Sequence, residues 1–137
     1  MTTTMFVPGT PAPQGSKKAM MPPRGHRPVL VESSTRLPAW RQAVALIART
    51  RCPQPATGPV ALEVEFVMPR TRAMRDRPAP PMVQRPDVDK LLRAVLDGLT
   101  GPAFPDDSQV VRLTATKRRA APGEPTGAHI TIKDYPQ

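Results

Sequence analysis

Carboxylates are concentrated in one short part of this sequence, and their spacing could bind a divalent metal ion. Residues 87 to 107 hold five of the eleven Asp and Glu residues, offset there by only Lys90 and Arg93, whereas the whole chain has a net charge of +9. Clustered carboxylates would repel the phosphates that such a basic chain attracts, unless a cation lies between them. Mg²⁺ prefers oxygen ligands and keeps several waters, so two or three carboxylates suffice. The pattern predicts a Mg²⁺ site, with Mn²⁺ as a substitute, that polarises a phosphate and helps to generate hydroxide from water.

The first candidate ligands fall at the start of an expected helix. Asp87 and Asp89 can converge on one ion there, because Asp87 still lies outside the regular turn. Asp89, Arg93 and Asp97 follow at i, i+4 and i+8 on the face opposite a stripe of leucines and valines. Arg93 could therefore reach a phosphate held at the metal.

The remaining acids, Asp106 and Asp107, precede the next strand. If the connection doubles back, the start of that strand is expected near the beginning of the helix. Each acid also has a purely structural alternative. Asp87 could be only an N-cap, and Asp89 only a favourable charge at the positive end of the helix dipole. The Asp106-Asp107 pair could be only a turn, and Asp97 could pair with a basic residue one helical turn earlier.

The elements that would position these residues follow from hydrophobic periodicity and from the placement of 20 prolines. Apolar repeats predict helices over 37–51 and from Pro86 or Asp87 to about 99. Alternating apolar residues predict strands at 5–7, 29–31, 60–68, 110–116 and 129–132. Basic, Pro-rich loops are expected at 10–28 and 69–86, and a basic turn at 117–119. Strands and helices interleave, which predicts one α+β domain over residues 1–137, with a small mixed β-sheet packed with two main helices.

The basic surplus predicts a polyanionic partner, because Lys and Arg release condensed counterions when they meet phosphates. The single cysteine, Cys52, excludes an internal disulfide and a cysteine-rich zinc site, and it fits a reducing cytosol. No apolar run is long enough to span a bilayer. The candidates for phosphate contacts are Lys17, Lys18, Arg70, Arg72, Arg75, Arg77, Arg85, Lys90, Lys117, Arg118 and Arg119.

Two segments resemble the signature of the RusA-type Holliday-junction resolvases. They are Arg85-Pro-Asp-Val-Asp-Lys-Leu-Leu-Arg-Ala-Val-Leu-Asp-Gly-Leu-Thr100 and Phe104-Pro-Asp-Asp-Ser-Gln-Val110. That family carries Asp-x-Asp-Asn at a helix start, a basic residue one turn later, an Asp-Ala-Leu-Thr-like stretch and then Asp-Asp-x-Gln-Val. By this resemblance, the three essential acids are Asp87, Asp89 and Asp107, and Asp106 is the neighbour of the third. Arg93 stands where the family usually has a catalytic Lys.

The sequence departs from the family pattern in three places. Arg93 keeps the charge of the usual Lys but has a planar fork and another reach. Lys90 occupies the usual Asn position, and the connection before Asp106 looks about one residue shorter. These departures leave the metal ligands in place and concern rate and substrate preference.

The resemblance implies a homodimer that binds four-way DNA junctions and makes paired nicks with Mg²⁺, in recombination and repair. It also implies a phage or prophage origin, and action in a bacterial or phage-infected cytosol close to the nucleoid. Neither a membrane nor a nucleotide cofactor is expected. Two alternatives remain: a non-catalytic DNA-binding protein of the same fold, and a broader nuclease that cuts flaps or forks. Binding unaffected by Mg²⁺, without cleavage, would mark the first, and side-by-side digestion of branched substrates would mark the second.

Overall fold

A computed structural model describes residues 1–15, 18–20, 29–31 and 35–136. Its main elements, in chain order, are β1 (Thr2–Pro8), β2 (Lys18–Met20), β3 (Val29–Val31), α1 (Leu37–Arg51), β4 (Val60–Met68), α2 (Val88–Leu99), β5 (Val110–Arg119) and β6 (Gly127–Asp134). Two short 3-10 helices, η1 (Arg72–Met74) and η2 (Asp107–Gln109), lie in the connections on either side of α2. This is the α+β class that the sequence predicts.

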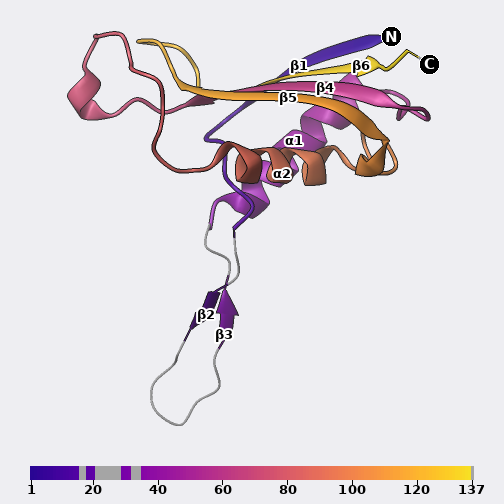
Figure 1. The fold of residues 1–137 in the computed structure, drawn as a ribbon, viewed down its shortest axis with the longest axis horizontal. Coiled ribbons are helices and arrows are strands. Elements are labelled where there is room, and N and C mark those ends of the chain that lie inside the picture. Colours follow the sequence, from indigo (N-terminus) through magenta and orange to yellow (C-terminus); the bar gives the residue numbers. More distant parts are fainter. Residues whose placement is uncertain (16–17, 21–28, 32–34, 137) are drawn as a thin grey trace.

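Four strands form one mixed sheet in the order β1-β6-β4-β5. Strand β6 is antiparallel to both of its neighbours, whereas β4 and β5 run parallel. Parallel neighbours need a crossover connection, and α2 provides it here. Strands β2 and β3 form a separate antiparallel pair that stands away from this sheet (Figure 1).

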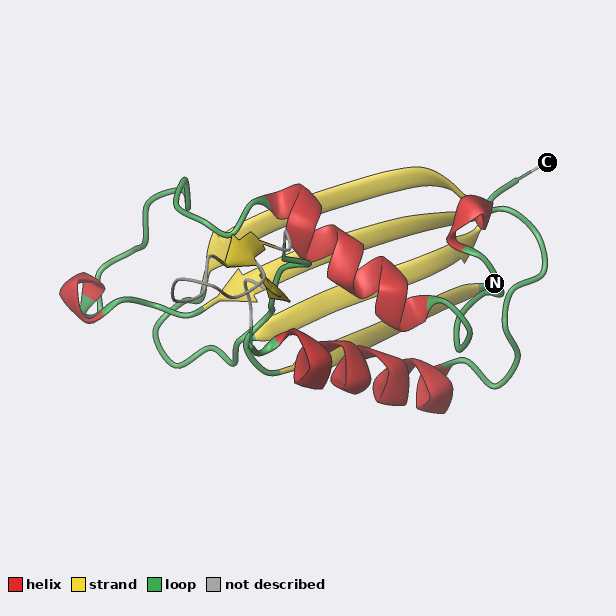
Figure 2. Cartoon of the chain, turned by 90° about the horizontal axis from the view of Figure 1, so that it is seen from below, coloured by secondary structure: helices red, strands yellow, loops and turns green. Residues whose placement is uncertain are grey.

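Both long helices cover the same face of the sheet (Figure 2). The core forms between them and the alternating residues of β4, of which Leu62, Val64 and Phe66 are buried. Trp40 and Val44 of α1 pack into this core, together with the apolar stripe of α2. The two helices pack tightly at Gly98, where an added Cβ would lie 2.9 Å from the Val44 Cβ. The core therefore fixes α2, which begins directly after Asp87 and carries Asp89.

The bounds of α1 and β4 are those expected from the sequence, and α2 begins right after Asp87. Strand β1 is longer than expected, and so is β6. Two local expectations were wrong. Residues 117–119 do not form a turn, because they continue β5 and pair with residues 66–68 of β4. The region 10–28 is not loop throughout, since residues 18–20 form β2.

Candidate active site

The start of α2 presents two carboxylates to solvent. Asp87 occupies the N-cap position with extended backbone (φ −68°, ψ 143°), but its side chain makes no capping hydrogen bond. Asp89 lies in the first turn, and its Oδ1 accepts a hydrogen bond from the Lys90 backbone N–H at 2.9 Å. Both side chains are exposed. The helix start therefore does not use the Asp87 side chain as a cap, which leaves that carboxylate accessible to a ligand.

An ion pair connects this helix to the third candidate ligand. The Arg93 Nη1 donates to the Asp107 Oδ2 at 3.0 Å, and the same nitrogen lies 4.0 Å from the Asp97 Oδ1. Asp107 is the first residue of η2, so the contact bridges two elements that follow each other in the chain. The expected pairing of Asp97 with the basic residue one turn earlier is present, but Asp107 is the closer partner.

The strand that follows Asp107 does not start near the beginning of α2, which corrects the expectation from the sequence. The end of β5 lies there instead. The Lys117 Nζ donates to the backbone carbonyls of Gln84 and Pro86 at 2.7 and 2.8 Å, directly before Asp87. Strand β5 runs past α2 from η2 to this point. Its first residues therefore follow Asp107, and its last residues hold the segment before Asp87.

Asp106 and Gln109 fix the short helix that carries Asp107. The Asp106 side chain accepts the Ser108 N–H at 2.9 Å, and the Gln109 Oε1 accepts the Asp106 N–H at 3.0 Å, a reciprocal capping box. The hydrogen bonds from Ser108 lower the pKa of the Asp106 carboxyl. The Gln109 amide also donates to the carbonyls of Ala56 and Gly58 at 2.9 and 3.0 Å. Sequence reasoning missed Gln109, although the Asp-x-x-Gln spacing is the signature of such a box.

The candidate ligands fit a hard divalent cation by their chemistry. Asp87, Asp89 and Asp107 offer carboxylate oxygens, the ligand type that Mg²⁺ and Mn²⁺ prefer. Within residues 1–15, 18–20, 29–31 and 35–136, no three Asp, Glu, His or Cys side chains are gathered closely enough to hold an ion. Asp107 instead has the Arg93 guanidinium as its partner. The donor set is therefore suitable, and its third member is paired with a cation of the protein itself.

Five basic side chains of the candidate DNA-binding set are bonded to the protein's own acceptors. Arg70 donates to the carbonyls of Ala120, Arg75 and Arg77 and so folds the 69–86 loop onto itself. Arg77 donates within the same loop, and Lys117 holds its end. Arg118 forms a two-pronged pair with Glu124 at 2.7 and 2.8 Å. Arg119 donates to the Pro69 carbonyl at 2.8 Å. These five side chains therefore stabilise the loops and strands on which the other basic side chains of the set lie.

Four basic side chains of the set are exposed and make no side-chain hydrogen bond or ion pair within the described part of the chain. They are Arg72, Arg75, Arg85 and Lys90. Arg72 and Arg75 lie at η1, the tip of a loop that extends beyond the sheet (Figures 1 and 2). Lys17 and the side chain of Lys18 fall outside the described residues. A DNA phosphate backbone would contact these four exposed side chains before the five that are bonded within the protein.

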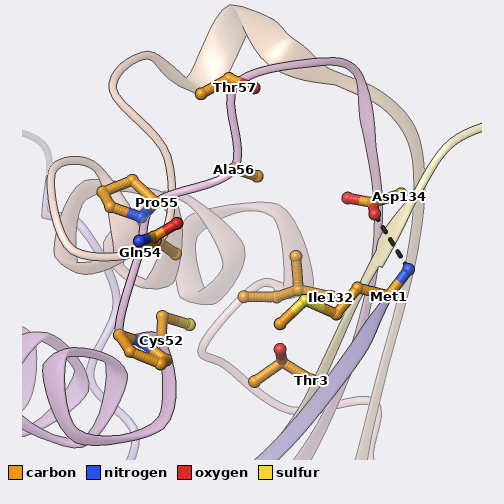
Figure 3. Close-up of a pocket in the computed structure, with 11 residues that line it drawn as sticks. Met1, Thr3, Cys52, Gln54, Pro55, Ala56, Thr57, Ile132 and Asp134 are labelled. Atoms are coloured by element: carbon orange, nitrogen blue, oxygen red, sulfur yellow. Dashed lines mark hydrogen bonds and ion pairs between the residues drawn. The ribbon is translucent and has the colours of Figure 1, made fainter.

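A separate pocket of about 420 Å³ lies at the C-terminal end of α1, and none of the candidate ligands lines it. Met1, Cys52 and Ile132 contribute to its lining, and the Met1 ammonium lies 2.9 Å from the Asp134 Oδ2 (Figure 3). Burial raises the pKa of the Cys52 thiol. A neutral thiol is a poor nucleophile and a poor metal ligand, so the chemistry of this pocket differs from that of the carboxylate site.

A comparison with protein families relates this site to known enzymes. The sequence model of the family described as endodeoxyribonuclease RusA matches residues 8–133, which includes every candidate carboxylate. This chain belongs to the RusA family. It is an endodeoxyribonuclease of a family of Holliday-junction resolvases, whose members depend on a metal ion. A comparison with curated proteins finds no match. Among the described helices of this RusA-family enzyme, none has the length and apolar character needed to cross a membrane.

Proposed function

We propose that this RusA-family enzyme resolves four-way DNA junctions by paired, Mg²⁺-dependent nicks and acts as a homodimer. The observation that carries the proposal is the Arg93–Asp107 ion pair, because it ties the third acid to the helix that presents the first two. Residues 1–137 would form one catalytic domain that works in the cytosol of a bacterium or of a phage-infected cell.

In the proposed site, Asp87, Asp89 and Asp107 would hold the metal, and Asp106 would support Asp107 by fixing η2. Bound there, Mg²⁺ would supply charge to polarise the scissile phosphate and to lower the pKa of an attacking water. Arg93 would neutralise charge on the phosphoryl group in the transition state. The same guanidinium nitrogen lies 4.0 Å from the Asp97 Oδ1, so a carboxylate of α2 also helps to hold it in place. The exposed arginines of the 69–86 loop would hold the DNA by its phosphates.

The test is cleavage of a synthetic immobile four-way junction, with Mg²⁺ or with EDTA. The wild type should make paired nicks only with Mg²⁺. Asp89→Asn should lose the nicks and keep junction binding, because it removes one metal ligand and little else. Asp76→Asn is the matched control, since Asp76 is an exposed acid of the basic loop outside the candidate set.

Three results would contradict the proposal in different parts. Full Mg²⁺-dependent cleavage by Asp89→Asn would refute the ligand assignment. Junction binding without nicks by the wild type would indicate a DNA-binding protein of this fold. Equal cleavage of flaps, forks and four-way junctions would indicate a broader nuclease. Size-exclusion chromatography with light scattering tests the dimer, because two sites related by a two-fold axis are needed for paired nicks on symmetric strands.

A further inference from the structure

A pocket of about 410 Å³ lies beside the start of α2 and is lined by three arginines, Arg36, Arg85 and Arg119. The arginines come from three separate segments: the residue before α1, the loop before α2 and the end of β5. Prolines and methionines supply most of the other walls, and no Asp or Glu is among the described residues that line the pocket. The described residues that line the pocket therefore carry only positive charge.

The three arginines differ in how firmly they are held. The Arg119 Nη1 donates to the Pro69 carbonyl at 2.8 Å, and its Nε is buried without an acceptor among the described residues. Arg36 and Arg85 are exposed and make no side-chain hydrogen bond or ion pair within that part of the chain. Like charges around one pocket repel one another, and an anion between them would relieve that repulsion. An anion would also occupy donors that have no acceptor among the described residues.

The pocket and the carboxylates share one fixed segment of the chain. Arg85 lies two residues before Asp87, and Lys117 holds the carbonyls on both sides of Arg85. Pro13 also lines the pocket, and the N–H of the next residue, Gln14, donates to the Lys90 carbonyl at 2.9 Å, which ties the segment after β1 to the first turn of α2. An anion in the pocket would thus lie next to whatever is bound at Asp87 and Asp89.

We infer that this pocket binds one backbone phosphate of the DNA, a neighbour of the phosphate that is cut. Arg36 and Arg85 contact the phosphate oxygens, while Arg119 supplies fixed positive charge at the base. The apolar walls accept the deoxyribose attached to that phosphate. By holding this phosphate, the pocket sets the position of the DNA strand relative to the carboxylates. This inference rests on the proposed function only for the choice of DNA as the anion.

The first measurement is the salt dependence of junction binding in EDTA, where no cleavage occurs. Each phosphate contact contributes about 0.9 to the slope of log K against log salt concentration. Arg36→Gln and Arg85→Gln should each lower the slope, and the double variant should lower it by about 0.9 in total, because both side chains serve one phosphate. The matched control is Arg112→Gln, an exposed arginine of β5 outside the pocket, and its slope should equal that of the wild type.

The second measurement replaces single phosphates near the cut by neutral methylphosphonates. Wild type and Arg112→Gln should lose about tenfold in affinity at one position, and the double variant should lose nothing further there. No position-dependent loss in the wild type, or the same loss in the double variant, would overturn the inference. A double variant whose slope falls by about 1.8 would also overturn it, because the two arginines would then serve separate phosphates. Since binding is read in EDTA, an enzyme that fails to nick would refute the proposed function and leave this result intact.

Discussion

The Arg93 guanidinium lies 3.0 Å from the Asp107 carboxylate and 4.0 Å from that of Asp97, so one cation serves two acids on two elements. The pair is exposed, and exposed pairs contribute only about 0–1 kcal/mol to stability. Its importance is therefore positional. The ion pair holds η2 against α2, and breaking it costs little free energy. A bound metal ion could therefore replace Arg93 as the partner of the Asp107 carboxylate.

Arg93→Met is expected to reduce nicking by about 10²- to 10³-fold, the usual cost of removing one charge-stabilising group from a transition state. Mn²⁺ affinity, measured by electron paramagnetic resonance, should not fall, because the variant frees Asp107 from a competing cation. Arg93→Lys, which keeps the charge, should retain more activity than Arg93→Met. Nicking by Arg93→Met at the wild-type rate would show that this side chain has no part in the reaction.

Lys117→Met is expected to slow nicking by about tenfold or more, because small displacements of reacting groups carry large costs. The variant releases the carbonyls of Gln84 and Pro86, which precede Asp87. The half-saturating Mg²⁺ concentration should rise, while junction affinity in EDTA should change no more than in Lys133→Met. Lys133 pairs with Glu63 on the other face of the sheet and provides the same loss of charge. Identical Mg²⁺ titrations for the two variants would contradict the positioning role.

Gly98→Ala is expected to lower the free energy of unfolding by about 1–2 kcal/mol. Overpacking costs about 1–3 kcal/mol, and the better helix propensity of Ala returns up to about 1 kcal/mol. The added Cβ would meet the stiff Val44 side chain at 2.9 Å. In a Val44→Ala background the same change should cost less, because the 2.9 Å contact with the Val44 Cγ1 is removed, whereas the contacts with the Cβ at 2.9 Å and with the Arg41 carbonyl oxygen at 3.1 Å remain. Urea denaturation followed by circular dichroism measures both, and equal effects in the two backgrounds would exclude this contact as the cause.

Glu124→Gln should destabilise the fold at pH 6 and do so much less at pH 3. The hydrogen bonds from Arg118 lower the pKa of Glu124 from 4.5 to about 2 in the folded protein. A depressed carboxyl pKa gives stability that is present above the unfolded pKa and is lost as pH falls toward the folded one. The difference between wild type and variant should therefore shrink by roughly half or more between these two pH values. A constant difference would argue that Glu124 contributes by packing alone.

The helices could be predicted because their apolar repeats are local and complete. The end of β5 could not, because Lys117 to Arg119 continue the strand only through pairing with Phe66 to Met68, about fifty residues earlier in the chain. A run of three basic residues has no mark of its own that separates a turn from an edge strand. Tertiary pairing, rather than local preference, decided this element.

For the candidate site, spacing alone placed Asp87 and Asp89 together at the start of α2. The roles of the basic residues were not accessible in the same way. Lys117 and Arg70 bind backbone carbonyls, and every residue has one, so the sequence does not indicate which carbonyl a basic side chain will meet. The position of Asp107 beside Arg93 likewise depends on the path of the chain after α2. Gln109 is different, because its spacing from Asp106 in the sequence is itself the signature of a capping box.

Trp40 is the only tryptophan of the chain, and it is buried in the core between α1 and the sheet. Its indole lies 3.7 Å from where a Cβ on Gly9 would stand, and it lines none of the pockets described above. Intrinsic fluorescence therefore reports whether this enzyme is folded, with no signal from the carboxylates or the arginine pocket. A variant that keeps the wild-type emission spectrum and loses cleavage has lost chemistry and not structure.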